Sequence, residues 1–426
     1  MGKIYIIDVT NRDGVQAARL SLSKLEKTII NLYLNQMGVF QSEAGFCTVN
    51  HESNYFQANL ELCSLGVLQP MRLSGWARAT VADIESSFRL VPGIRHINLS
   101  APVSGQMIKG KFKGEKTPEE IIAAMTESVK AARSMGIETI GVNAEDASRA
   151  DMGYLIEFGL AARESGADRL RYCDTLGYDN PFTIYEAGKV IAQKTGLPVE
   201  LHCHGDLGMA VANSLAGARG VIDGGQDAYI NTTVNGIGER AGNADLVSVI
   251  LSVTKSKNFA EGYPLAGSID LSMAWRIARF AGYAFGLPIP FNQPGVGANA
   301  FAHASGIHAN AVLKDPHNYE LYDYVELGRG EPERLETGRD ICTGEYGGTA
   351  SLRYLLNTIF MEQDAASWPD SRLEEIAELV AYANVESQKP ILEDEIKFIA
   401  AYPTVARRLL TLKPPANDQA EAKPER

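Results

Sequence analysis

Short apolar runs alternate with helix-like segments along the first part of the chain. Runs that are rich in β-branched residues and end in polar residues or glycine are typical of strands; they cover residues 4–9, 39–45, 71–78, 96–101, 139–145, 169–175, 199–204 and 227–234. Apolar positions between them repeat with a helical period, at residues 23–36, 81–89, 118–134, 150–165, 180–194 and 210–223. This alternation predicts an α/β fold, a closed (β/α)8 TIM barrel of parallel strands. A dinucleotide-binding sheet is disfavoured because no Gly-x-Gly-x-x-Gly follows the first strand.

The pattern changes after about residue 260. Apparent helices at 271–282, 347–362 and 373–385 predict a mainly helical C-terminal extension. We therefore expect a catalytic barrel over residues 1–260 and helical subdomains over 261–412. Residues 413–426 lack apolar anchors, which predicts a disordered tail.

Composition limits the class of partner. The chain has 426 residues and a formal net charge of −12, which argues against binding to nucleic acid or anionic membranes. The N-terminus becomes polar too soon for a signal peptide, and no apolar run is long enough to span a bilayer. Its 5 scattered cysteines include no Cys-x-x-Cys pair and suggest reduced thiols. A cytoplasmic enzyme is expected, with a local cationic site for any anionic substrate.

A candidate metal site lies at the ends of two predicted strands. His202 and His204 alternate along a strand, so their side chains share a face, while Arg12 and Asp13 follow the first strand. Either histidine alone could be a core residue and Asp13 a turn residue or cap. Together they suit a catalytic divalent metal with room for a chelating substrate. Mixed nitrogen and oxygen ligands select weakly among Mg²⁺, Mn²⁺, Co²⁺ and Zn²⁺.

Further polar residues mark the same C-terminal rim, where barrel chemistry is expected. Glu145 could transfer a proton or pair with Arg149 one turn on. The loop 235–243 has three glycines and could bring an amide oxygen to the metal, whereas the lysine of a phosphate-binding P-loop is absent. The candidate substrate-binding residues are Gln16, Glu43, Arg78 and Thr175.

Four motifs in this order resemble the Claisen-condensing branch of the metallolyase TIM barrels, which includes homocitrate, isopropylmalate and citramalate synthases. They are Arg12-Asp13-Gly14-Val15-Gln16, His202-Cys203-His204, Asn235-Gly-Ile-Gly-Glu-Arg-Ala-Gly-Asn243 and His303-Ala-Ser-Gly-Ile-His308. The resemblance covers roughly residues 3–330. It implies Asp13, His202, His204 and Asn243 as metal ligands. It also implies catalytic roles for Arg12, Glu145, His308 and Tyr319.

The same resemblance implies a reaction and an assembly. A base relay of His308, Glu145 and Tyr319 would deprotonate the methyl group of acetyl-CoA, the co-substrate. The enolate would attack a metal-bound 2-oxo acid, Arg12 would stabilise the alkoxide, and thioester hydrolysis would release CoA. His308 and Tyr319 would reach into a neighbouring barrel, which implies a homodimer with exchanged C-terminal segments.

Departures from the family narrow the substrate. Ser104-Gly105-Gln106-Met107 lacks the histidine of isopropylmalate synthases, which disfavours a branched-chain keto acid. Gly141 stands where lysine-pathway homocitrate synthases place an arginine, so one clamp for a distal carboxylate of 2-oxoglutarate is missing. The segment 343–348 also departs. These features favour oxaloacetate, as in the Re-face-specific citrate synthases, with Arg78 as the best candidate for a second carboxylate.

Other activities remain as alternatives. The second choice after citrate formation is homocitrate synthesis from 2-oxoglutarate, and the third is isopropylmalate or citramalate synthesis. A lyase similar to hydroxymethylglutaryl-CoA lyase would share the barrel, but its glycine-rich loop bears a reactive cysteine that 235–243 lacks. A metal-dependent amidohydrolase usually places His-x-His after the first strand rather than the seventh. A binding protein without activity is disfavoured because every proposed ligand is present.

Overall fold

The computed structural model describes residues 2–330, 338–342, 352, 354–356, 368–387 and 391–410. The chain divides into two compact units, Met1–Gly297 and Ala298–Arg426, and each is described by itself. The first unit extends past residue 260, where we expected the barrel domain to end, because α11 (Ala274–Phe285) packs on α1 (Lys24–Met37). The tail expected at 413–426 lies outside the described residues, as does most of the helix expected at 347–362.

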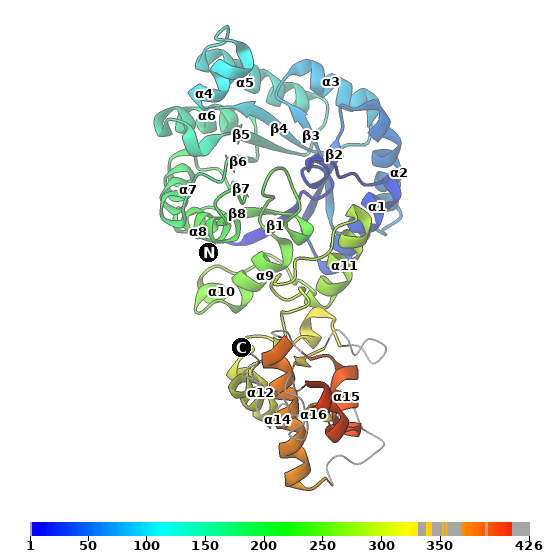
Figure 1. Ribbon diagram of the computed structural model, residues 1–426. Helices are drawn as coiled ribbons and strands as arrows, with labels where there is room; N and C mark the ends of the chain where they lie inside the picture. Colours follow the sequence, from blue (N-terminus) through cyan, green and yellow to red (C-terminus); the bar gives the residue numbers. More distant parts are fainter. Residues whose placement is uncertain are drawn as a thin grey trace, which may run out of the picture. The chain divides into compact units, whose positions relative to one another are not determined.

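The first unit is a closed barrel of eight parallel strands in sequence order, which confirms the predicted fold (Figure 1). Closure joins the first strand to the last, with Ile7 opposite both Gln41 and Asn231. The strands are β1 (Ile4–Asp8), β2 (Gln41–Phe46), β3 (Arg72–Arg78), β4 (His96–Pro102), β5 (Thr139–Glu145), β6 (Arg169–Asp174), β7 (Val199–Cys203) and β8 (Ala228–Thr232). Each begins and ends within two residues of its predicted bounds, and β8 ends at Thr232 rather than at residue 234 because Val234 begins a 3₁₀ turn.

Helices surround this barrel (Figure 1). Besides α1 and α11 they are α2 (Ser53–Ser64), α3 (Val81–Leu90), α4 (Gly105–Phe112), α5 (Pro118–Ser134), α6 (Met152–Ser165), α7 (Pro181–Thr195), α8 (Ala210–Asp223), α9 (Leu246–Lys255) and α10 (Phe259–Gly262). Short 3₁₀ turns are η1 (Gly14–Gln16), η2 (Asn50–Glu52), η3 (Ala147–Arg149), η4 (Val234–Gly236) and η5 (Leu271–Met273). The six barrel helices named from periodicity are confirmed, and the segment expected at 271–282 forms η5 and α11. α2, α4 and α9 were not among those predicted.

Local caps explain where helices begin. Thr117 accepts a hydrogen bond from the backbone of Glu120, whose side chain accepts one from the backbone nitrogen of Thr117 at 2.8 Å. Pro118 occupies the first helical position, where no backbone donor is needed. This reciprocal capping box fixes the start of α5 at the predicted residue.

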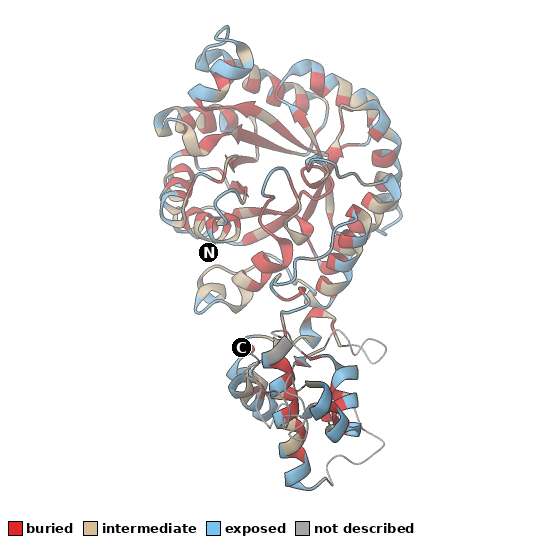
Figure 2. Cartoon of the chain, in the orientation of Figure 1, coloured by how far each residue is buried: buried red, intermediate tan, exposed pale blue. Residues whose placement is uncertain are grey.

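The barrel interior is polar, whereas the apolar core lies between the strands and the helices. The strands are buried along most of their length (Figure 2). The inward-facing charged side chains of Glu43, Arg171 and Glu200 are fully buried. Because a buried charge is costly unless it is paired, these residues require partners inside the barrel.

The second unit is mainly helical, as predicted. It contains a two-stranded parallel sheet of β9 (Ala302–His303) and β10 (Asp340–Ile341). Its helices are α12 (Gly306–Lys314), α14 (Asp370–Ser387), α15 (Glu393–Ala401) and α16 (Pro403–Leu410), with 3₁₀ turns η6 (Pro316–Asn318) and η7 (Val325–Leu327). Leu356, Ile376 and Ile396 are among the residues of one apolar cluster. Among the described residues, no helix is long and apolar enough to cross a membrane.

Candidate active site

The predicted metal ligands converge at the C-terminal ends of β1, β7 and β8. The backbone nitrogen of Asp13 donates to the carbonyl oxygen of Val9 at 2.7 Å, which fixes the turn after β1. His202 lies on β7 and His204 just beyond it, where an antiparallel bridge joins His204 to Asn243 of the loop after β8. The backbone thus brings together residues that are far apart in the sequence.

Asp13, His202 and His204 form a buried cluster whose ligand atoms all lie within 4.8 Å of one another. The Nε2 atom of His202 is 3.1 Å from Asp13 Oδ2, and that of His204 is 3.7 Å from the same oxygen. The centres of the two imidazole rings lie 5.0 Å apart, and the angle between the ring planes is 80°. Two nitrogen ligands and one carboxylate facing one point are suited to a divalent metal.

Asn243 lies beside this cluster and could provide a fourth ligand, its amide oxygen. Its Nδ2 donates to Asp13 Oδ2 at 3.0 Å, while its buried Oδ1 has no hydrogen-bond partner among the described residues. A Cβ atom at Gly238 would lie 1.9 Å from this Oδ1, so the loop needs glycine there. A buried acceptor without a partner, on a side chain that already contacts Asp13, fits a metal ligand, because such an oxygen is otherwise costly.

Electrostatics keep these groups in the protonation states that a metal requires. Burial, and then the neighbouring His202, lowers the pKa of His204 to about 4, so its imidazole is neutral at pH 7. Burial alone would raise the pKa of Asp13, but the Arg12 guanidinium and both histidines hold it well below its usual range. The neutral imidazole of His204 and the ionised carboxylate of Asp13 are ready to bind a metal without losing protons.

Arg12 lies beside the cluster and is held on several sides. Its Nε donates to Glu43 Oε1 at 2.5 Å, and its Nη1 lies 3.2 Å from Asp13 Oδ1 and 3.3 Å from the Gln16 side-chain oxygen. Its guanidinium lies 5.9 Å from the ring centre of Trp76. The arginine is therefore fixed next to the metal ligands.

Not every predicted substrate-binding residue is placed to touch a substrate. Glu43 is fully buried, and its oxygens accept from Arg12, Asn98 and Arg171; we infer that it orients Arg12. Arg78 is at the rim with a side chain 73% exposed, and it binds Asp83 at 2.8 Å rather than joining the buried cluster. A role for Arg78 toward a second carboxylate stays a prediction.

Glu145 has a different partner from the one we considered. Lys111 on α4 donates to both of its oxygens at 2.6 and 2.5 Å, whereas Arg149 binds Asp146. The pairing with Arg149 was therefore wrong, because Asp146 follows in a left-handed conformation (φ 63°) and takes the arginine itself. The hydroxyl of Thr175 accepts from the backbone nitrogen of Asp146 at 2.9 Å. Lys111 was not predicted as the partner of Glu145 because it lies on α4, after the preceding strand β4, and so is distant in the sequence.

The remaining predicted residues lie elsewhere. Asn235 donates to the carbonyl oxygen of Ala278 at 2.8 Å, so within the glycine-rich loop it is Asn243 that joins the cluster. His308 and Tyr319 belong to the second unit, where their exposed rings lie 4.1 Å apart. Their rings contact each other, and their catalytic role stays a prediction.

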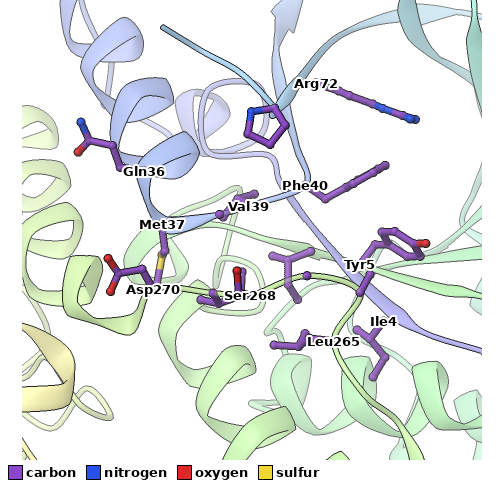
Figure 3. A pocket seen from close by; sticks show the side chains of 16 residues that line it. Ile4, Tyr5, Gln36, Met37, Val39, Phe40, Arg72, Leu265, Ser268 and Asp270 are labelled. Atoms are coloured by element: carbon purple, nitrogen blue, oxygen red, sulfur yellow. The ribbon is translucent and has the colours of Figure 1, made fainter. Parts of the chain in front are cut away.

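A cavity of about 680 Å³ opens at the opposite end of the barrel (Figure 3). It is lined by residues at the N-terminal ends of the first strands and by the segment 265–270. The rings of Tyr5 and Phe40 lie 4.8 Å apart, and the guanidinium of Arg72 lies 4.8 Å from the Phe40 ring. None of the predicted site residues lines this cavity, in keeping with a structural role for this face of a barrel.

These features define a (β/α)8 protein of the HMGL-like family, to which the chain belongs: the family model HMGL-like matches residues 3–280. A second model, homocitrate synthase post-HMGL domain-like, matches residues 296–362. The predicted family is thereby confirmed.

Individual relatives are more specific. The citrate (Re)-synthase of Dehalococcoides mccartyi is 62% identical over 98% of this chain and 100% of the relative. The 2-isopropylmalate synthase 2 of Caldanaerobacter subterraneus is 38% identical, covering 82% of this chain and 84% of the relative. Homocitrate synthase 1 of Nostoc is 33% identical, covering 93% and 96%.

Solved structures agree on the fold. The hydroxymethylglutaryl-CoA lyase of Pseudomonas aeruginosa has a TM-score of 0.55 at 15% identity, covering 67% of this chain and 94% of that one. The lyase of Bacillus subtilis gives 0.53 at 17% identity, covering 68% and 96%. At such identities the likeness extends to the barrel alone.

Proposed function

We propose that the protein condenses acetyl-CoA with oxaloacetate and water to give citrate and free CoA. The observation that carries the reaction class is the buried cluster of Asp13, His202 and His204, with Arg12 3.2 Å from Asp13. The relative that is 62% identical over nearly the whole chain, named as a citrate (Re)-synthase, supports the choice of substrate.

Each group has a definite task in this reaction. A divalent ion held by Asp13, His202, His204 and Asn243 would act as a Lewis acid on the 2-carbonyl group of oxaloacetate. A base removes a proton from the acetyl methyl group, and the resulting carbon forms a bond to the carbonyl carbon. Arg12 donates hydrogen bonds to the oxygen on which negative charge develops. Water then cleaves the thioester, which leaves a carboxylate and the CoA thiol.

Charge balance favours a dianionic substrate. The chain carries a net charge of −12, so an anion needs a local attraction. Within the site, Asp13 and Glu43 are both ionised: burial alone would raise the pKa of Glu43, but Arg171 and Arg12 lower it to about 2. Their charges are matched by Arg12 and Arg171. A divalent cation would add two positive charges that a 2-oxo dicarboxylate neutralises.

Substrate length is limited at two positions. A Cβ atom at Gly141 would lie 2.0 Å from Asn98 Oδ1, so the space that an arginine would need at Gly141 is filled. Trp76 contacts both Arg12 and Asn143: its ring centre lies 5.9 Å from the Arg12 guanidinium, and with the Asn143 amide turned over, its indole nitrogen donates to the amide oxygen at 3.1 Å. A bulky indole and a missing clamp favour the four-carbon oxaloacetate over the longer 2-oxoglutarate, which remains the second candidate on the strength of the Nostoc relative.

We infer that the base comes from the second unit of a neighbouring subunit, in a homodimer. The paired, exposed rings of His308 and Tyr319 are available to a partner. Lys111 holds Glu145 at the barrel rim, where it can relay the proton.

Mixing two inactive variants tests the shared site. In a dimer that combines Asp13→Asn with His308→Ala, one of the two sites receives an intact barrel and an intact histidine. Random exchange makes half of the dimers mixed, so about a quarter of the wild-type activity returns. Lack of any recovery in verified mixed dimers would mean that each chain builds its own site.

Thiol release from acetyl-CoA tests the reaction. The purified chain with Mn²⁺ is assayed against oxaloacetate, 2-oxoglutarate, 2-oxoisovalerate and pyruvate. The highest kcat/KM is expected with oxaloacetate, with citrate formed in step with the thiol. Preference for 2-oxoglutarate would make the protein a homocitrate synthase. Release with none of the four, together with cleavage of hydroxymethylglutaryl-CoA, would favour the lyase alternative.

A further inference from the structure

A closed ring of side chains crosses the interior of the barrel below the metal ligands. Its members come from five strands or strand ends and each contacts the next: Arg12, Glu43, Arg171, Glu200, Asn231, His202 and Asp13. Only Arg12, Asp13 and His202 have a task in the reaction proposed above. The other members raise the question of what a fully buried polar circuit does there.

One half of the ring joins Arg12 to Arg171 through a shared carboxylate. Glu43 accepts from Arg12 Nε at 2.5 Å with one oxygen and from Arg171 Nη2 at 2.6 Å with the other. Glu43 and Arg171 are fully buried, so no water is available to replace a lost partner. The position of one guanidinium is thus tied to that of the other.

The other half joins Arg171 to the metal-binding histidine. Arg171 Nε donates to Glu200 Oε1 at 2.6 Å, and Asn231 Nδ2 donates to the same oxygen at 2.7 Å. The Oδ1 atom of Asn231 lies 3.0 Å from His202 Nδ1. Arg169 also donates to Glu200, at 2.7 Å, and completes the pairing of its charge.

The chemistry of these groups permits one arrangement of protons. An ionised carboxylate only accepts, so Asn231 must direct its NH₂ group to Glu200 and its oxygen to His202. That oxygen can only accept, so the proton of a neutral His202 lies on Nδ1. The lone pair of Nε2 then faces Asp13 and the metal position.

Charges in the circuit also balance. Asp13, Glu43 and Glu200 are matched by Arg12, Arg169 and Arg171. If Glu43 or Glu200 loses its charge, Arg171 keeps only one charged partner. Its guanidinium must then shift on the remaining carboxylate to replace the lost interaction. A change on one side therefore alters the geometry on the other.

We propose that Arg171, with Glu43, Glu200 and Asn231, acts as a positioning group that sets the ligating nitrogen of His202 and the place of Arg12 together. The proposal rests on the metal site of the proposed function. It assigns to Arg171 a coupling role: a perturbation at Arg12 reaches the metal, and a perturbation at His202 reaches Arg12.

Mn²⁺ affinity of Glu43→Gln tests the coupling. Glu43 contacts Arg12 and Arg171 but not His202. Because Arg12 itself lies 3.2 Å from Asp13, Glu43→Gln is also compared in an Arg12→Gln background, where only the path through Arg171 can carry an effect to the metal. With coupling, the Kd of the metal-stripped protein for Mn²⁺, measured by electron paramagnetic resonance, rises about 10- to 100-fold, the range typical of residues behind metal ligands. Glu52→Gln is the matched control, because Glu52 forms a buried pair with Lys27 at 2.5 Å outside the ring; its Kd stays at the wild-type value.

A second variant tests whether a perturbation at His202 reaches Arg12. Its result is informative even if Glu43→Gln fails to fold. The Asn231 side chain contacts His202 and Glu200 but not Arg12, so Asn231→Ala removes no contact of Arg12. At saturating Mn²⁺ its kcat falls at least tenfold, and by more than the same substitution lowers kcat in an Arg12→Gln background, while KM for acetyl-CoA stays near the wild-type value. Wild-type Mn²⁺ affinity in folded Glu43→Gln, or wild-type kcat in metal-saturated Asn231→Ala, would overturn the coupling alone. A wild-type chain that binds no Mn²⁺ would instead overturn the proposed metal site and the coupling with it.

Discussion

Asp13→Asn isolates the charge of one metal ligand with little change of shape. In the wild type, Asp13 Oδ1 lies 3.2 Å from Arg12 Nη1, and Oδ2 accepts from Asn243 Nδ2 at 3.0 Å. An asparagine would keep its oxygen toward Arg12 and place an NH₂ group opposite that of Asn243. Two donors cannot face each other, so the Asn243 amide must turn over, and its free oxygen then accepts from residue 13. The substitution thus removes two ligands, the carboxylate and the Asn243 oxygen.

The expected loss is large for the metal and moderate for the fold. Loss of one partner of a buried charge costs about 3–5 kcal/mol, and at about 1.4 kcal/mol per tenfold the Mn²⁺ affinity falls at least a hundredfold. Mn²⁺ at about 100 times the wild-type Kd stabilises the wild type by about 2.7 kcal/mol, which raises Tm by roughly 5 °C. At the same concentration the variant gains less than about 1 °C.

Thermal unfolding followed by circular dichroism, with and without Mn²⁺, measures this difference, and thiol release measures turnover. Asp168→Asn is the matched control: it removes a carboxylate paired with Arg133 at 2.5 Å beside the start of β6, at the other end of the barrel. The control should keep the metal-dependent shift. An equal Mn²⁺ shift in Asp13→Asn and the wild type would refute the assignment of Asp13 as a ligand.

Three further results are expected. Trp76→Ala removes the indole beside Arg12 and so makes room for a longer substrate. The ratio of kcat/KM for 2-oxoglutarate to that for oxaloacetate rises about tenfold or more. An unchanged ratio in steady-state assays would exclude Trp76 as a residue that limits substrate length. His308→Ala keeps the wild-type Kd for Mn²⁺ in a titration but lowers kcat at least a hundredfold, and a normal kcat would remove His308 from the catalytic groups. Burial, and then the charges of Arg72, Arg169 and Arg95, lowers the pKa of His96 from 6.5 to about 4 in the folded protein. The unfolded chain therefore binds this proton more readily than the folded one. Folding stability is lost as the pH falls from 6.5 to 4. This loss is at most about 3 kcal/mol; urea unfolding of His96→Gln at pH 7 and pH 5 should give a smaller difference than the wild type, and an equal difference would contradict the assignment.

The order of strands and helices could be predicted because each strand has a local signal. β5 runs from Thr139 to Glu145 as predicted, since an apolar run ends there in a polar residue at the barrel rim. α9 has only a weak signal: Ser248, Ser252 and Lys255 repeat at helical spacing, but the short apolar run from Leu246 to Leu251 could equally be a strand. The glycines of α4 weaken its helical pattern, and it is fixed instead by Ser104, whose hydroxyl accepts from Met107 at 3.1 Å.

The clustering of Asp13, His202 and His204 could be predicted for the same local reason, whereas the residues that support them could not. His202 and His204 stand two residues apart on one strand, which places them on one face. Arg171 and Glu43 are 128 residues apart, and only barrel closure brings them to 2.6 Å. Single-sequence patterns do not carry such pairings. The alternation of buried and exposed positions does not help either, because a charged residue at an inward position of a strand resembles a solvent-facing one.

The polar interior of the barrel connects stability to chemistry. Apolar side chains between strands and helices supply the burial that stabilises the barrel, so the interior is free to hold charges that contribute little net stability. Each interior charge is paired, which keeps the circuit neutral before a metal is added. In the proposed function, the field that a substrate meets at the rim would then come mainly from a bound metal and Arg12 rather than from the chain's net charge of −12. A protein that repels anions as a whole can in this way attract a dianion to one point.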